Sequence, residues 1–292
     1  MASAAQWVEG ARPRTLPAAV APVAVGTGAA FGLDGGSWPR ALLAMVVALA
    51  LQVGVNYAND YSDGIRGTDE ERVGPLRLVG SGAATPGTVK AAAMAAFAVA
   101  GVAGLALVAL AGAWWLLAVG AACILAAWFY TGGRNPYGYN GLGEVFVFVF
   151  FGLVAVLGTT YTQAGRISPA AILGACGVGL IACAILVANN LRDVPSDTIA
   201  GKRTLAVLLG DPASRTLYVS MVAVALVAVP VIALLTRSPW PLLGLLATPL
   251  AVRPVQAVRA RAEGGALVPV LAATGRLELV YGLLLGLGLG LA

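Results

Sequence analysis

The sequence has no histidine and few charged residues. Lys, Arg, Asp and Glu make up 11% of its 292 residues, whereas a typical soluble domain contains about 25%. So little charge cannot cover a surface that faces water on all sides, and the mean hydropathy is +0.87. The composition therefore excludes an ordinary soluble protein and indicates an integral membrane protein.

The lack of histidine also narrows the chemistry, because histidine is the commonest general base and the commonest transition-metal ligand. The cysteines Cys123, Cys176 and Cys183 all fall within apolar runs, which is typical of small packed residues rather than of disulfides or metal ligands. A metal bound by this chain must therefore be held by oxygen atoms, which favours Mg²⁺ or another hard cation.

Nine apolar segments approach the length of about 20 residues that a membrane-spanning helix needs. They predict an all-α polytopic membrane protein with one domain over residues 1–292, in which abundant glycine and alanine allow close helix packing. The last two segments are the weakest, because the eighth is short and rich in proline and the ninth begins with charged residues. The predicted spans are 15–32, 39–58, 89–110, 113–130, 143–162, 168–190, 214–235, 239–255 and 275–291.

The basic residues are distributed unequally between the two sides of these spans. Three of the 18, Arg40, Arg166 and Arg237, lie on one side, and the other 15 lie on the side of the N-terminus. The positive-inside rule then predicts a cytoplasmic N-terminus and, after nine spans, a C-terminus outside. This topology accounts for the net charge of +5, so we expect no nucleic-acid partner.

Two polar clusters stand at the ends of the second and sixth predicted spans. Residues four apart share one face of a helix, so each cluster aligns amides and carboxylates along its helix, although Pro195 is expected to kink the second one. Because both clusters end even-numbered spans, both face the cytoplasm. The aligned rows are Gln52, Asn56 and Asp60; Asn59 and Asp63; and Asn189, Asp193 and Asp197.

Carboxylates that face one another repel unless a cation lies between them, and Mg²⁺ combines a few carboxylates with water and phosphate oxygens. Basic side chains beside the acids can carry the remaining phosphate charge; they are Arg66, Arg72, Arg77, Lys202 and Arg203. The alternative is that these are solvated charges at helix ends. Two aligned clusters on one membrane face favour a metal-diphosphate site instead.

A third segment, from Tyr130 to Glu144, follows the fourth predicted span on the same side. Its glycines and Pro136 predict a tight loop, and Tyr137 within it is a candidate substrate-binding residue. Glu144 suits either the start of the fifth span, where the helix dipole favours an acid, or the substrate site. Both interpretations stay open at this point.

Three runs resemble the UbiA-type superfamily of intramembrane prenyltransferases: NDYSDGIRGTDEERVGPLRL (59–78), YTGGRNPYGYNGLGE (130–144) and NNLRDVPSDTIAGKRTLAVLLG (189–210). The resemblance covers nearly the whole chain. Within the superfamily, the runs are most similar to the subgroup that prenylates 1,4-dihydroxy-2-naphthoate in menaquinone synthesis. Many relatives have Asp at the positions of Gly67 and Gly201, so this subgroup has fewer or shifted metal ligands, and Asp69 is a candidate substitute.

The resemblance implies nine helices around a central cavity, in a Mg²⁺-dependent aromatic prenyltransferase of the bacterial cell membrane. The implied reaction transfers a polyprenyl group from polyprenyl diphosphate to 1,4-dihydroxy-2-naphthoate, with loss of carboxylate and pyrophosphate, giving demethylmenaquinone. Expected metal-site residues are Asp60, Asp63, Asp69, Asp193 and Asp197. The catalytic candidates are Asp60, Asp63, Asp193, Asp197 and Lys202. Expected substrate-binding residues are Asn56, Asn59, Arg66, Arg77, Tyr137, Asn189 and Arg203.

Several alternatives stay open. The donor motifs would look alike with 4-hydroxybenzoate, homogentisate, a porphyrin or a sugar phosphate as acceptor. The motifs also do not show which basic residues bind the diphosphate and which bind the carboxylate of the acceptor. A lipid transporter or lipid-binding protein is an alternative of another class, which broken helices in mid-membrane and inverted repeats would favour. The charges here lie at span ends instead.

Overall fold

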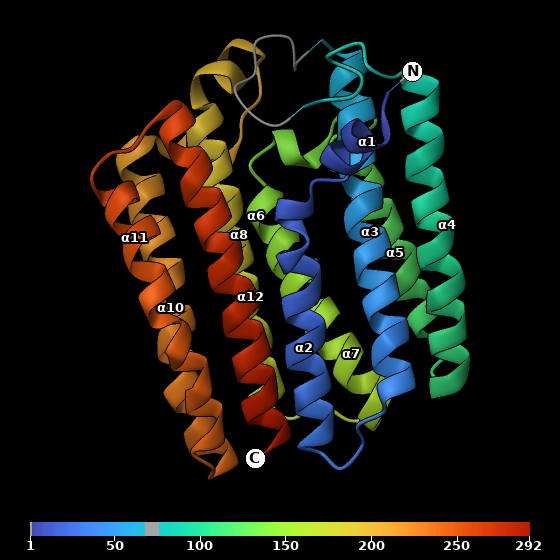
Figure 1. Cartoon of the computed structure of the whole chain (residues 1–292), viewed down its shortest axis with the longest axis vertical. Coiled ribbons are helices and arrows are strands. Elements are labelled where there is room, and N and C mark those ends of the chain that lie inside the picture. The colour runs from blue at the N-terminus through green and yellow to red at the C-terminus, as the bar shows by residue number, and fades with distance from the viewer. Residues whose placement is uncertain (1, 68–75) are drawn as a thin grey trace.

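The computed structural model describes residues 2–67 and 76–292, and the regular elements within these ranges are all helices. Figure 1 shows the long helices side by side and roughly parallel to one axis, as a single bundle. Helices satisfy their own backbone hydrogen bonds, which a chain of this composition needs in lipid. The predicted all-α class is confirmed.

Within the described ranges, seven helical stretches are long and apolar enough to cross a membrane. Two shorter apolar helices, α2 (Pro17–Phe31) and α5 (Leu116–Phe129), coincide with the first and fourth predicted spans. The multi-pass architecture is confirmed, whereas nine spans stay a prediction. The seven stretches are α3 (Trp38–Ile65), α4 (Pro86–Ala111), α6 to α7 (Gly143–Ala164), α8 (Pro169–Ile199), α10 (Asp211–Thr236), η4 with α11 (Trp240–Arg259) and η5 with α12 (Gly264–Gly290).

Several of these stretches change helix type along their length. The fifth predicted span consists of α6 (Gly143–Val147), the π-helical η3 (Phe148–Val154) and α7 (Ala155–Ala164). Short 3₁₀ segments, η4 (Trp240–Ala247) and η5 (Gly264–Leu267), precede α11 (Thr248–Arg259) and α12 (Val268–Gly290). The remaining short elements are α1 (Ala4–Gly10), η1 (Pro13–Thr15), η2 (Tyr137–Tyr139) and α9 (Leu205–Leu209).

The two helices that carry the polar clusters are longer than predicted. Helix α3 continues to Ile65 and α8 to Ile199, so both clusters are helical extensions rather than loops. Pro195 lies inside α8 without ending it, and Asp193 and Asp197 therefore keep their four-residue helical spacing. Figure 1 shows α1 at the end of the bundle opposite the C-terminus.

Small residues bring the central helices into close contact. At Gly28 of α2, an added Cβ atom would lie 1.8 Å from the carbonyl oxygen of Gly286 in α12. Because no side chain fits in that space, the backbones of α2 and α12 touch directly, as expected for glycine at membrane helix interfaces. A core of buried side chains from α2, α8, α10 and α12 surrounds this contact, including Val25, Ile181 and Tyr281.

Candidate active site

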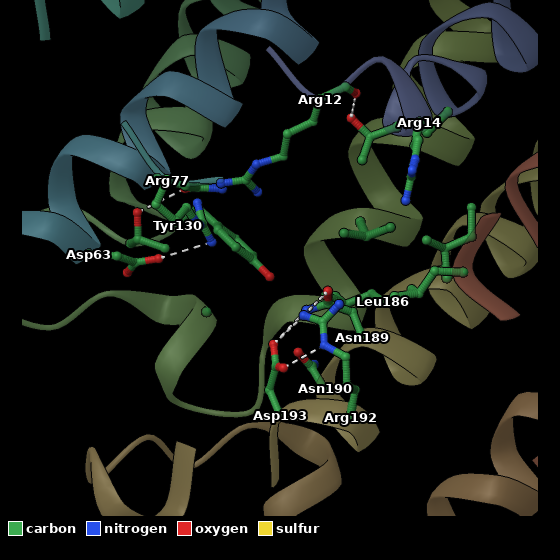
Figure 2. A pocket seen from close by; sticks show the side chains of 18 of the residues that line it. Arg12, Arg14, Asp63, Arg77, Tyr130, Leu186, Asn189, Asn190, Arg192 and Asp193 are labelled. Carbon is green, nitrogen blue, oxygen red and sulfur yellow. Dashed lines mark hydrogen bonds and ion pairs between the residues drawn. The ribbon is translucent and has the colours of Figure 1, made fainter. Parts of the chain in front are cut away.

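A cavity of about 830 Å³ lies where α3 and α8 end, and its charged part is drawn in Figure 2. Along α8 its lining changes from Ala182, Ile185 and Leu186 to Asn189 and Asp193. At about 1.5 Å per residue these positions extend over roughly 16 Å. The cavity therefore joins an apolar part, which Val147, Phe151 and Leu271 also line, to a charged part at the end of the bundle.

Aspartates from both clusters line this one cavity. Asp63 comes from α3, and Asp193 and Asp197 come from α8. The Nζ atom of Lys202 lies 4.0 Å from Oδ1 of Asp63 and 3.8 Å from Oδ1 of Asp197. One ammonium group thus bridges the two clusters. The predicted convergence across a shared cavity is confirmed for Asp63, Asp193 and Asp197, whereas Asp60 does not line the cavity.

Cations also lie beside the other carboxylates of the cavity. Arg192 donates two hydrogen bonds of 2.7 Å to the two oxygens of Asp193, and a third of 2.9 Å to Asn189 Oδ1. Arg77 Nη2 lies 3.7 Å from Oδ2 of Asp63. Acids and bases therefore alternate around the charged part, as a site for a metal ion and phosphate groups requires.

Tyr139, in the loop between α5 and α6, connects several of these groups. Its hydroxyl donates to Asp63 Oδ1, and its ring centroid lies 4.6 Å from Lys202 Nζ and 5.5 Å from Arg66 Cζ. The ring faces of tyrosine attract cations. Tyr139 therefore holds both an acid and a base of the site, a role that the sequence alone did not reveal.

Tyr137, the predicted substrate-binding residue of this loop, points elsewhere. Its hydroxyl donates to the carbonyl of Ala126 at 2.7 Å, and its ring stacks on Phe146 with centroids 3.9 Å apart. Residues two apart in the 3₁₀ turn η2 project in different directions, which is why Tyr139 and not Tyr137 lines the cavity. Burial raises the pKa of the Tyr137 phenol above its usual value.

Tyr130 lines the cavity next to this turn. Its phenol hydroxyl can donate through its hydrogen or accept through its oxygen.

The row Gln52, Asn56 and Asp60 on α3 binds neighbouring chain segments. The amides of Gln52 and Asn56 donate to Thr15 Oγ1 at 2.8 and 3.0 Å. The two oxygens of Asp60, which is fully buried, accept the backbone N–H groups of Leu78 and Val79 at 2.7 and 3.0 Å. These contacts give Asn56 and Asp60 structural roles, and their expected substrate and metal contacts stay predictions.

The second row on α3 faces the cavity. Asn59 lines it together with Asp63, and its Oδ1 accepts a hydrogen bond of 2.8 Å from the Thr131 hydroxyl. Asn189 on α8 lines the cavity as well, and its amide lies 3.5 Å from Asp193 Oδ2. The predicted amides at positions 59 and 189 are thus placed beside the carboxylates.

The other predicted residues lie around the cavity rather than in its wall. Arg66 is exposed and donates to the carbonyls of Thr131 and Gly133, whereas the exposed Arg203 donates its backbone N–H to the Tyr139 carbonyl at 2.8 Å. Glu144 is buried and accepts a hydrogen bond of 3.0 Å from Asn190. Asp69 and Arg72 lie outside the described residues.

Three arginines of the cavity wall were not predicted as site residues: Arg12, Arg14 and Arg192. In the sequence, Arg12 and Arg14 looked like topology signals before the first span, and Arg192 looked like one charge within the second cluster. The available signal was their position, since all three lie on the same predicted membrane side as the aspartates.

The oxygen atoms of the cavity fit a hard cation. Within residues 2–67 and 76–292, no group of three His, Cys, Asp or Glu side chains could hold a metal unaided. Asp63, Asp193 and Asp197, with the amides of Asn59 and Asn189, are instead spread over two facing helices. Such a partial set suits Mg²⁺, which usually takes one or two carboxylates and completes its shell with water and substrate phosphates.

Comparison with known proteins gives a consistent result. Residues 19–289 match the family described as the UbiA prenyltransferase family. A protein of Mycobacterium tuberculosis (strain ATCC 25618 / H37Rv) named 1,4-dihydroxy-2-naphthoate octaprenyltransferase is 58% identical, over 97% of this chain and 96% of that protein. A protein of the same name from Escherichia coli (strain K12) is 40% identical, over 98% of this chain and 95% of that protein.

The fold is also found among solved structures. A UbiA homolog from Archaeoglobus fulgidus bound to DMAPP and Mg²⁺ superposes with a TM-score of 0.66, covering 96% of this chain and 99% of that one. The two sequences are 14% identical, so this likeness concerns the arrangement of the helices.

Proposed function

Because this chain belongs to the UbiA prenyltransferase family, we propose that it transfers a polyprenyl group from polyprenyl diphosphate to 1,4-dihydroxy-2-naphthoate. The acceptor loses its carboxylate and pyrophosphate is released, which gives demethylmenaquinol, the reduced form of demethylmenaquinone. Relatives at 58% and 40% identity carry this acceptor in their names. The observation that carries the proposal is the shared cavity in which carboxylates from two helices, with cations beside them, adjoin an apolar wall.

The shape of the cavity suits an amphipathic donor. The diphosphate fits the charged part, where Lys202 and Arg192 provide positive charge beside Asp197 and Asp193. The prenyl chain fits the apolar part along Ile185, Leu186 and Phe151. Burial of each prenyl CH₂ contributes about 0.8 kcal/mol, so the apolar wall holds the chain while the cations fix its head.

Asp63, Asp193 and Asp197 would hold Mg²⁺ in this site, with Asn59 and Asn189 as further oxygen donors. When bound, Mg²⁺ neutralises charge on the leaving diphosphate. The presence of Mg²⁺ with DMAPP in the Archaeoglobus fulgidus homolog supports this assignment. Asp60 and Asp69 stay predicted members of the metal site.

The cations of the chain assist bond cleavage by electrostatics. As the allylic C–O bond breaks, its electron pair passes to the diphosphate, and Lys202 and Arg192 face the oxygens on which that charge develops. Their ion pairs with Asp197 and Asp193 fix them before the reaction, which is the requirement for preorganised stabilisation. Tyr139 orients Lys202 through its ring.

No protein base is needed for the second half of the reaction. The electron-rich ring carbon that bears the carboxylate forms the new C–C bond to the allylic carbon. The bond to the carboxylate then breaks, CO₂ leaves, and the electron pair of that bond restores the aromatic ring. A chain without histidine can therefore carry out this half of the reaction.

The charged part of the cavity and α1 face the cytoplasm in this proposal, with the C-terminus outside. The excess of basic residues on the side of the aspartates supports this orientation. Membrane insertion in a bacterial cell also lets the apolar donor reach the cavity from lipid.

The decisive experiment incubates purified protein with 1,4-dihydroxy-2-naphthoate, a polyprenyl diphosphate and Mg²⁺, and measures product mass and pyrophosphate. We expect demethylmenaquinol, which air oxidises to demethylmenaquinone, and one pyrophosphate per product. Parallel reactions with 4-hydroxybenzoate and homogentisate test the acceptor, and faster turnover of either would contradict the assignment. Absence of Mg²⁺-dependent pyrophosphate release would instead favour a lipid transporter or lipid-binding protein.

A further inference from the structure

Two arginines face one another in the charged part of the cavity. Figure 2 shows the guanidinium groups of Arg12 and Arg77 pointing toward each other, and both side chains line the cavity. In the described part of the chain, the Nη2 atom of Arg12 is buried without a hydrogen-bond partner. Asp63 offsets the charge of Arg77, so a second buried guanidinium beside it is costly unless a further anion pairs with Arg12.

The position of Arg12 is fixed by the polar row of α3. Gln52 and Asn56 donate to Thr15 Oγ1, and the Thr15 hydroxyl donates to the Arg12 carbonyl at 2.9 Å. Arg12 itself has a φ of 55°, in the left-handed region, which costs a residue with a side chain on the order of 1 kcal/mol. Three side chains therefore hold one arginine in an unfavourable backbone conformation, pointing into the cavity.

The position of Arg77 is fixed by the same row. Asp60 lies one helical turn beyond Asn56 on α3, and its carboxylate accepts the N–H groups of the two residues that follow Arg77. One face of one helix thus sets both arginines. This is the arrangement expected of a preorganised anion-binding pair.

We propose that Arg12 and Arg77 form the binding site for the carboxylate of the aromatic acceptor, an inference that rests on the proposed function. The carboxylate is a single anion that a guanidinium group can bind through two parallel hydrogen bonds. Lys202 and Arg192 pair with the aspartates of α8, the helix that also supplies apolar residues to the cavity wall. We therefore assign these two cations to the diphosphate of the donor. Arg12 comes from the N-terminal segment and has no carboxylate partner among the described residues.

A second polar atom fits the same ligand. Oε1 of Gln52 is buried without a hydrogen-bond partner in the described part of the chain, and Gln52 lines the cavity next to the turn that carries Arg12. A buried acceptor left unpaired costs about 1–3 kcal/mol. The acceptor has a hydroxyl group beside its carboxylate, and this hydroxyl would donate to Gln52 while the carboxylate binds the arginines.

The test compares Arg12→Gln with Arg259→Gln, which removes an exposed arginine at the end of α11. For Arg12→Gln we expect KM for dihydroxynaphthoate to rise at least about tenfold, with KM for the polyprenyl diphosphate unchanged within about twofold. Arg259→Gln should leave both constants unchanged. Arg12→Lys keeps the charge without the fork of donors, and it should recover only part of the loss.

An equilibrium measurement supplies a readout independent of turnover. Naphthoate fluorescence should show that the unsubstituted protein binds 1-hydroxy-2-naphthoate at least about tenfold more tightly than 1-naphthol. Arg12→Gln should abolish that preference and leave the affinity for 1-naphthol unchanged.

Failure of this inference is distinct from failure of the proposed function. If the unsubstituted protein forms no product from dihydroxynaphthoate, the proposed function is wrong. If it forms product while Arg12→Gln raises KM for the diphosphate instead, or changes neither KM, the carboxylate assignment is wrong. Equal affinity of the unsubstituted protein for 1-hydroxy-2-naphthoate and 1-naphthol would also overturn it, whether or not the variant folds.

Discussion

Each of the three aspartates that line the cavity has a cation within 4.0 Å, and these pairs define the chemistry residue by residue. Lys202 bridges Asp63 and Asp197, and Arg192 holds Asp193 through both oxygens. Breaking a buried pair leaves an uncompensated charge, so a single substitution at any of these residues should have a large effect on ligand binding. Such substitutions should act on metal and diphosphate binding before they act on the fold.

Replacement of a metal-site carboxylate should remove most activity. Because Mg²⁺ would supply several kcal/mol of transition-state stabilisation, Asp63→Asn and Asp193→Asn should each lower kcat about a thousandfold. Turnover at saturating Mg²⁺ measures this, with Asp34→Asn, in the exposed turn after α2, as the control. Near-normal turnover in both cavity variants would show that these aspartates hold no metal.

The two tyrosines of η2 should differ in effect. Tyr139→Phe keeps the ring near Lys202 but loses the hydroxyl that donates to Asp63, so kcat/KM should fall about tenfold. Tyr137→Phe loses only a bond to the Ala126 carbonyl and should change kcat/KM less than about twofold. Steady-state kinetics of the pair decide the point, and a larger loss in Tyr137→Phe would restore the original prediction for that residue.

At the scale of elements, α3 presents two polar rows with different tasks. Asn59 and Asp63 face the cavity, whereas Gln52, Asn56 and Asp60 hold the turns that carry Arg12 and Arg77. The sequence predicted both rows from their spacing. It could not separate their tasks, because Gln52, Asn56 and Asp60 bind backbone groups and Thr15, and nothing in the helical repeat shows where those turns lie.

Asp60→Asn tests this division. An amide can accept only through its oxygen, so one of the N–H groups of Leu78 and Val79 loses its partner and the loop that carries Arg77 loosens. We expect KM for dihydroxynaphthoate to rise about tenfold or more, with the Mg²⁺ dependence unchanged. A shift of the Mg²⁺ dependence comparable to that of Asp63→Asn would instead show that Asp60 belongs to the metal site.

At the scale of the whole molecule, direct backbone contacts hold the bundle together. Hydropathy and charge predicted the helical class and most helix positions well, because lipid imposes the same length and polarity on each span. The ends of α3 and α8 were predicted too short, since their last turns are polar and are stabilised by contacts across the cavity. The glycine contact between α2 and α12 was foreseen only as a general tendency.

That contact predicts a large effect of one methyl group. Gly28→Ala would place Cβ 1.8 Å from the Gly286 carbonyl oxygen, so α2 and α12 must separate, at a cost of about 1–3 kcal/mol or more. Thermal unfolding in detergent should show a lower Tm. Gly101→Ala in α4, where nothing lies within 4 Å of the added atom, should leave the Tm unchanged or raise it slightly.

The bridge that Lys202 makes also offers a way to monitor ligand binding without substituting any residue. Lysine occurs only at positions 90 and 202, and Lys90 lies over the rings of Tyr61 and Trp128, 5.7 and 5.9 Å from their centroids. Reductive methylation followed by peptide mass spectrometry would therefore compare one amine inside the cavity with one internal reference. Shielding of Lys202 alone by inorganic pyrophosphate with Mg²⁺ would report occupancy of the cavity in the unsubstituted protein, directly in native membranes.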